Sequence, residues 1–198
     1  NGERVFIEFN KAALSRWLDI PSVKALSQRY EECYEEFCVS KGWTLNIKRN
    51  AIYVLMHTFA HLLIKQMSMA SGYSSSAIRE RIYFNEKMTG ILLYTGSADK
   101  EGSLGGLVEL GNINKLVPLM KDAFQEALLC TNDPECMSNV PAGNNLNGAA
   151  CHSCCMISET ACENGNRMLD RGLVVPIALR EKESFFRELV CELCQLEI

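Results

Sequence analysis

The sequence predicts a mixed α/β fold (α+β) with a central buried helix, a small sheet and a cysteine-rich loop. Three observations lead to this expectation. A long, nearly all-apolar helical stretch follows Asn50, a short apolar run between glycines occupies residues 90–95, and six of the ten cysteines fall within residues 130–162. The first pattern is typical of a helix buried on all sides and the second of a strand buried on both faces.

The composition indicates an ordinary globular protein. The 198 residues are 47% hydrophobic and 22% charged, and no apolar run approaches the roughly 20 residues of a membrane span. We therefore expect a soluble, cytoplasmic protein without a membrane partner. The first residue is Asn and not Met, so we also expect a piece of a longer polypeptide or a processed chain. A protein that binds nucleic acid on its own usually carries a basic surface. The net charge of −4 argues against such a protein.

The first 49 residues are expected to form an N-terminal strand followed by helices. Residues 5–9 alternate as a strand does, and residues 11–20 resemble a short helix that Pro21 stops. From Ser22, apolar residues recur at spacings of three and four until Gly42, which predicts a second helix with one buried face.

The central helix is expected to begin after an Asn50 N-cap, to run to about Met69 and to end before Gly72. His57 and His61 stand one helical turn apart on it. This spacing resembles the zincin motif H-E-x-x-H, but Thr occupies the position of the general base, so a peptidase would lack its mechanism. Two interpretations stay open: histidines hydrogen-bonded at a packed polar seam, or a metal bound by both histidines and a distant carboxylate.

The middle of the chain predicts a short helix, a strand and a loop. Residues 77–83 read as a short helix that carries Arg79 and Arg81, and residues 90–95 as the buried strand. The glycine-rich stretch 96–106, which contains Asp99, would either present backbone N–H groups to an anion or serve as a flexible connection. No Gly-Lys-Ser/Thr follows it, so the chain has no ATPase motif.

In the last third of the chain, we expect the cysteine loop, residues 130–162, to follow directly after a helix. Pro118 fits the first turn of a helix that ends near Leu128 and delivers Cys130. Beyond the cysteines we expect a short helix over 163–171, an extended segment over 173–177 and an amphipathic helix over 180–196. The predicted organisation is therefore an N-terminal part (1–49), a central domain (50–175) and a C-terminal helix (176–198).

The cysteine loop predicts a structural metal. Cys151 and Cys154 have the C-x2-C spacing that lets two thiolates from one turn reach the same ion. Cys130 and Cys162 flank this pair and would complete a closed four-sulfur site. Disulfides and free buried thiols are the alternatives. Cys136 in place of Cys130, or Cys155 in place of Cys154, also stays open.

Several motifs in fixed order resemble one family. They are His57-Thr-Phe-Ala-His61-Leu-Leu, Gly72-Tyr-Ser, Arg79-Glu-Arg-Ile-Tyr83, Gly90-Ile-Leu-Leu-Tyr-Thr95, Gly102-x-x-Gly105-Gly106 and Asn147-Gly-Ala-Ala-Cys151-His-x-Cys154. Together they resemble the helicase-associated domain of the DrmB family of the DISARM antiphage system and, more distantly, the C-terminal domain of MrfA-type repair helicases. The resemblance covers about residues 50–175.

The resemblance implies a zinc-binding domain, a zinc-stapled loop with Cys130, Cys151, Cys154 and Cys162 as metal ligands, and Cys136 as a rival for the fourth position. It also implies a superfamily 2 helicase as partner and DNA binding through the complex. It implies no catalytic residue.

An enzyme is the rival hypothesis. His57, His61 and Asp99 would then line a polar pocket of a metal-dependent phosphoesterase or nuclease. An open cleft that joins these three side chains would favour the enzyme, whereas buried histidines bonded to the backbone would disfavour it.

Overall fold

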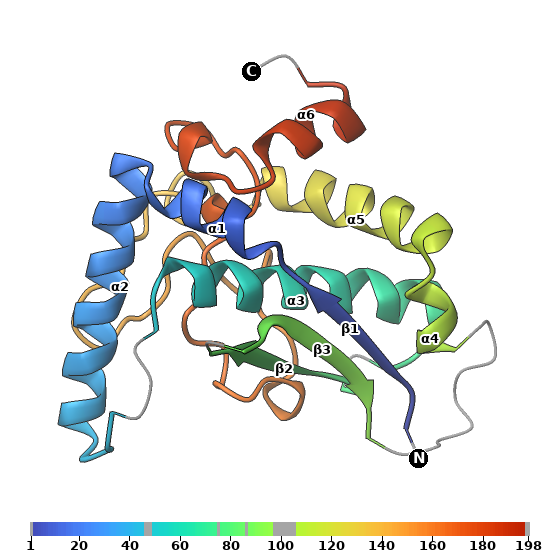
Figure 1. The fold of residues 1–198 in the computed structure, drawn as a ribbon, viewed down its shortest axis with the longest axis horizontal. Coiled ribbons are helices and arrows are strands. Elements are labelled where there is room, and N and C mark those ends of the chain that lie inside the picture. Colours follow the sequence, from blue (N-terminus) through green and yellow to red (C-terminus); the bar gives the residue numbers. More distant parts are fainter. Residues whose placement is uncertain (1, 46–48, 75, 86, 97–105, 197–198) are drawn as a thin grey trace.

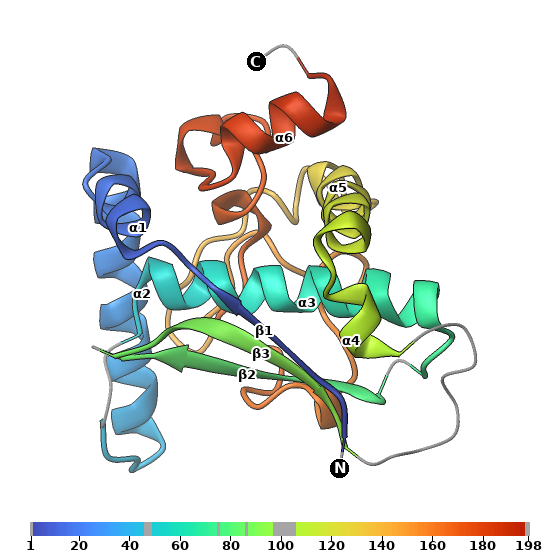
Figure 2. The same cartoon turned by 45° about the vertical axis from the view of Figure 1, so that its right-hand side comes forward.

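The computed structural model describes residues 2–45, 49–74, 76–85, 87–96 and 106–196. It confirms the predicted mixed fold. Helix α3 (Ala51–Ser71) runs through the middle of the molecule, with a three-stranded sheet on one side and helices α5 (Ile113–Leu128) and α6 (Arg187–Cys194) on the other (Figures 1 and 2). Helices α1 (Lys11–Leu18) and α2 (Pro21–Ser40) cover one end of α3, and the short α4 (Leu107–Leu110) lies near the other.

Helix α3 is the hub because sixteen of its 21 residues are buried. Its caps are those predicted: the Asn50 side chain accepts hydrogen bonds from the N–H groups of Ile52 and Tyr53, and Gly72 ends the helix at a φ of 72°. Phe59 packs among three other phenylalanine rings, those of Phe9, Phe124 and Phe186. Residues from 1–49, 50–175 and 176–198 all contribute to this one core, and the three-part division stays a prediction.

The sheet is antiparallel with the order β1-β3-β2, formed by β1 (Arg4–Glu8), β2 (Ile78–Phe84) and β3 (Thr89–Thr95). The register places Arg4 opposite Tyr94 and Phe6 opposite Leu92. One face packs on α3, and the other is turned away from the helices (Figure 1).

Four expectations about individual elements were wrong. Residues 78–84 form strand β2 and not a helix, because Ile78 and Glu80 alternate inward while Arg79 and Arg81 point out. Helix α5 begins at Ile113 behind an Asn112 N-cap, so Pro118 lies inside it.

The other two errors lie near the C-terminus. Residues 163–177 contain only a 3₁₀ turn at Arg171–Leu173, because backbone groups there bond to the cysteine loop. The expected helix over 180–196 is limited to α6, after a 3₁₀ turn at Glu181–Glu183. No helix of the described part of the chain is long and apolar enough to cross a membrane.

Candidate metal centre

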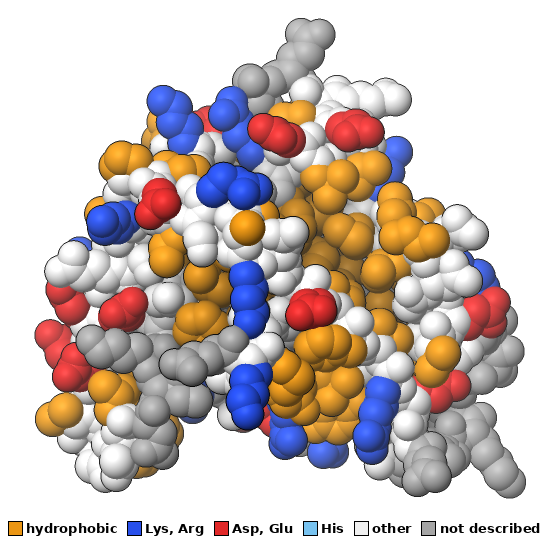
Figure 3. All heavy atoms as spheres, in the orientation of Figure 1, with side chains coloured by type: hydrophobic (Ala, Val, Ile, Leu, Met, Phe, Trp, Pro, Cys, Tyr) orange, Lys and Arg blue, Asp and Glu red, His pale blue; other side chains and the backbone are white. Residues whose placement is uncertain are grey.

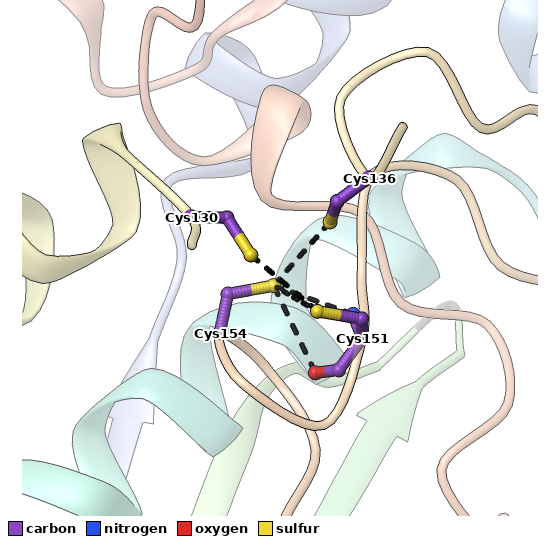
Figure 4. A group of neighbouring side chains, drawn as sticks. All are labelled: Cys130, Cys136, Cys151 and Cys154. Carbon is purple, nitrogen blue, oxygen red and sulfur yellow. Dashed lines mark hydrogen bonds between the residues drawn. The ribbon is translucent and has the colours of Figure 1, made fainter. Parts of the chain in front are cut away.

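Four cysteine sulfurs converge at the end of α5, those of Cys130, Cys136, Cys151 and Cys154 (Figure 4). All four Sγ atoms lie within 4.8 Å of one another. The Sγ of Cys151 is 3.4 Å from that of Cys130 and 3.7 Å from that of Cys154, and Cys136 is 3.7 Å from Cys154. Sulfurs arranged tetrahedrally at about 2.3 Å from zinc lie about 3.8 Å apart, so this geometry fits a zinc ion and none of these pairs is a disulfide.

The loop that carries Cys130 and Cys136 is folded around one carboxylate. Asp133 accepts hydrogen bonds from the backbone N–H of Cys130 at 2.9 Å and of Met137 at 3.1 Å. The buried Arg171 guanidinium donates to the same carboxylate at 2.7 Å and to the carbonyl of Ala127 at the end of α5. This ion pair, in which one guanidinium nitrogen contacts both carboxylate oxygens, therefore fixes the loop against the chain that follows Cys162.

N–H donors surround the sulfurs. Asn132 donates its backbone N–H to Cys130 Sγ and its side-chain amide to Cys151 Sγ, each at 3.4 Å, and the Cys151 N–H donates to Cys154 Sγ at 3.3 Å. A hydrogen bond to the charged form of a group favours that form, so these donors favour thiolates, which are the form that binds metal.

The pKa values of the two C-x2-C thiols, Cys151 and Cys154, also favour the thiolate form. A hydrogen bond from the neighbouring Cys155 thiol lowers the pKa of Cys154 to about 5, against the effect of its burial. Burial acts to raise the pKa of Cys151, but the Asn132 amide and backbone N–H groups lower it below the ordinary value. Burial raises the pKa of Cys136, so this thiol reaches the thiolate form least readily without a metal.

The donor set fits a structural zinc. Four sulfurs close the coordination shell and leave no position for a substrate, so the ion would stabilise the fold and carry out no reaction. Cys130, Cys136, Cys151 and Cys154 would hold it. The binding free energy would anchor the turn and loop structure of residues 129–158 on α5.

The structure brings together three of the four predicted ligands, Cys130, Cys151 and Cys154. It places Cys162 elsewhere, beside His57, His61 and Glu80, and puts Cys136 in the fourth position. The reason is the path of the chain, because residues 156–161 carry Cys162 away from the C-x2-C turn and back to α3. Cys155 is fully buried and belongs to neither group.

His57 and His61 are fully buried, and neither opens to solvent. His57 Nδ1 lies 3.1 Å from the carbonyl of Met168, and His61 Nδ1 lies 3.0 Å from that of Cys155. Asp99, the third residue of the rival enzyme hypothesis, lies outside the described residues.

Sequence reasoning missed Glu80, because residues 77–83 were predicted to be helical. A strand over the same residues would have turned Glu80 to the inside of the sheet beside Ile78. That alternation was the available signal.

A family model, the MrfA Zn-binding domain, matches residues 59–155. The match contains all four clustered cysteines and stops before Cys162. A curated relative, "DISARM protein DrmB" of Bacillus paralicheniformis (strain ATCC 9945a / NCIMB 11709 / CD-2), is 52% identical over 192 residues.

The chain is similar to DrmB over 96% of its length and to the MrfA Zn-binding domain over residues 59–155. The predicted resemblance and the structural zinc are thereby confirmed. The alignment covers 96% of this chain but 34% of the relative, so the chain spans about a third of the length of that DrmB protein.

Proposed function

We propose that this chain is a non-catalytic, zinc-stapled module of a cytoplasmic DISARM antiphage complex, where it partners a superfamily 2 helicase and contacts DNA within the complex. The observation that carries the proposal is the 52% identity to a DISARM protein over 96% of the chain. The closed four-sulfur cluster supports a structural rather than a catalytic metal.

The burial of both histidines supports the same conclusion. A hydrolytic metal needs an open coordination position that substrate and water can reach. His57 and His61 have no exposed surface, and their Nδ1 atoms are engaged by backbone carbonyls. This arrangement favours a structural role over the phosphoesterase or nuclease hypothesis.

The outward face of the sheet supports a contact with nucleic acid. Strand alternation places three arginines, one glutamate and several apolar or aromatic residues on it: Arg4, Phe6, Glu8, Arg79, Arg81, Tyr83, Leu92 and Tyr94. Figure 3 shows hydrophobic side chains over the sheet with Lys and Arg side chains around them. Phe6 and Tyr83 lie edge to face with ring centroids 5.9 Å apart. Aromatic rings stack on bases and arginines bind phosphates, which is the chemistry of a single-stranded nucleic-acid platform.

The charge limits how much this face can contribute alone. Three arginines neutralise about three phosphates, which gives a salt dependence of about −2 in log K against log[salt] for a single strand. One of them, Arg81, also pairs with Glu163 at 2.9 Å. We therefore assign most phosphate contacts to the helicase and an auxiliary contact to this face.

The test is co-purification with superfamily 2 helicases of the same organism, followed by DNA-binding titrations of any complex that forms. The variant Arg4→Gln/Arg79→Gln/Arg81→Gln is expected to leave the complex assembled and to weaken its binding of single-stranded DNA. A matched control, Arg16→Gln/Lys24→Gln/Lys41→Gln, removes three positive charges from α1, α2 and the α2 C-cap and is expected to bind as the wild type does. Failure of the wild-type chain to associate with any helicase would overturn the proposal, and equal losses in both variants would remove the sheet face from it.

A further inference from the structure

A second group of metal-binding side chains lies between α3 and the sheet. His57 and His61 come from α3, Glu80 from β2, and Cys162 from the residue after the 3₁₀ turn Glu159–Ala161. One donor atom from each lies within 4.8 Å of the other three, and all four residues are buried. The family match at 59–155 includes neither His57 nor Cys162, so this group is distinct from the four-cysteine centre.

The donor distances fit a tetrahedral ion. His57 Nε2 is 3.2 Å from Cys162 Sγ and 3.3 Å from Glu80 Oε1, and His61 Nε2 is 3.9 Å from the same oxygen. Around zinc, nitrogen and oxygen donors lie about 3.4 Å apart, and either lies about 3.6 Å from a sulfur. The group is therefore as compact as a coordination shell.

Hydrogen bonds with surrounding groups orient the candidate ligand atoms toward the centre of the group. A carbonyl only accepts, so the carbonyls of Met168 and Cys155 fix the proton of each imidazole on Nδ1 and leave the Nε2 lone pairs facing the centre. Cys162 Sγ accepts the N–H groups of Asn164 at 3.4 Å and Asn166 at 3.3 Å.

The carboxylate is held in the same way. Glu80 Oε1 accepts the backbone N–H of Glu163 at 3.1 Å. Second-shell contacts of this kind orient the ligands of protein-bound metals.

Two buried polar atoms of these residues lack a partner. His61 Nε2 and Glu80 Oε2 are buried without a hydrogen bond to any described residue. Leaving a buried polar atom without a hydrogen bond destabilises the fold, and more so when the group is charged. An ion at the centre would give the imidazole nitrogen a bond and would neutralise the carboxylate.

The charges also balance. One thiolate, one carboxylate and two neutral imidazoles carry −2, which a divalent cation cancels in a site that excludes water. Two imidazoles, a carboxylate and a thiolate together suit zinc better than the hard cations Mg²⁺ and Ca²⁺, which prefer oxygen.

We propose that His57, His61, Glu80 and Cys162 form a second structural zinc site that clamps the chain after the cysteine loop onto α3 and β2. The two sites would then hold residues 130–162 at both ends. This proposal rests on side-chain geometry and is independent of the DISARM assignment.

The first test is the metal content of the purified chain by mass spectrometry, with zinc present during expression. The wild type is expected to retain two zinc ions per chain after gel filtration. Glu80→Gln and Cys162→Ser are each expected to retain one. The control Cys38→Ser removes a buried thiol of α2 that belongs to neither cluster and is expected to retain two.

A second measurement needs no variant. ¹¹³Cd NMR of cadmium-substituted wild-type chain is expected to give two resonances, one of an all-sulfur site and one of a site with nitrogen, oxygen and a single sulfur. One zinc per chain and a single all-sulfur resonance would overturn the proposal, even if the ligand variants fail to fold.

Discussion

Replacing Asp170 by Asn tests how the buried polar network holds the turn-rich C-terminal part. The Asp170 carboxylate is fully buried and accepts five hydrogen bonds. They come from Tyr30 Oη at 2.8 Å, the N–H groups of Ala149 at 3.2 Å and Gly172 at 2.9 Å, and the two terminal nitrogens of Arg180 at 3.0 and 2.8 Å. Asp170 thus joins α2, the cysteine loop and the C-terminal segment.

The amide keeps the shape of the carboxylate but turns an NH₂ group toward N–H donors and removes the charge opposite Arg180. Breaking a buried ion pair on one side costs about 3–5 kcal/mol. Arg180 is 16% exposed and keeps a second partner in Glu183, which places the expected loss at the lower end, about 3 kcal/mol. At about 2–4 °C per kcal/mol for a chain of this size, the melting temperature should fall by about 6–12 °C.

The assay is thermal unfolding by circular dichroism at fixed zinc concentration, with zinc content measured in parallel, because bound metal itself raises the melting temperature. The control is Glu163→Gln, which removes a carboxylate from the Arg81–Glu163 pair at 2.9 Å. That pair is 53% and 40% exposed, so no measurable shift is expected. If Asp170→Asn has the same melting temperature as the wild type, the buried hydrogen-bond network around Asp170 does not stabilise the fold.

Four further predictions follow from the packing, the metal and the charge. Phe59→Ala should lower the free energy of unfolding by about 3–5 kcal/mol in urea titrations, because the ring is 1% exposed among three others, and a loss under about 1 kcal/mol would contradict its central position. A strong zinc chelator should abolish the near-ultraviolet circular dichroism, whereas an unchanged spectrum of zinc-free chain would show that the metal is not structural. Zinc retention, followed with a colorimetric chelator, should be lost as the pH is lowered, because protons compete with zinc for the four thiolates; a zinc content that does not change across an acid titration would argue against thiolate ligation. The isolated chain, with its net charge of −4, should bind DNA weakly at physiological salt, and submicromolar affinity in fluorescence polarisation would contradict an auxiliary role.

The elements that could be predicted are those whose signals are local. The caps of α3, Asn50 and Gly72, stand in the sequence at the ends of an apolar stretch, and glycine accommodates the positive φ that ends the helix. Strand β3 is an apolar run bounded by glycine. The C-x2-C pair likewise needs only one turn of chain to bring Cys151 beside Cys154.

The features that were missed depend on pairing between distant segments. Residues 78–84 form a strand because β3 supplies the neighbouring edge, and Glu80 meets the α3 histidines only through that pairing. The choice between Cys136 and Cys162 depends on the course of residues 156–161, which no spacing rule specifies. The aromatic and basic sheet face joins residues some 75 positions apart in sequence, such as Arg4 and Arg79, through their common neighbour Tyr94.

The most direct test of the zinc-stapled fold is the zinc K-edge X-ray absorption spectrum of the purified chain. The four-cysteine centre predicts a first shell dominated by sulfur at about 2.3 Å, and this holds whether or not the second site is also filled. A first shell made only of nitrogen and oxygen at about 2.0–2.2 Å would contradict the assignment of zinc to Cys130, Cys136, Cys151 and Cys154.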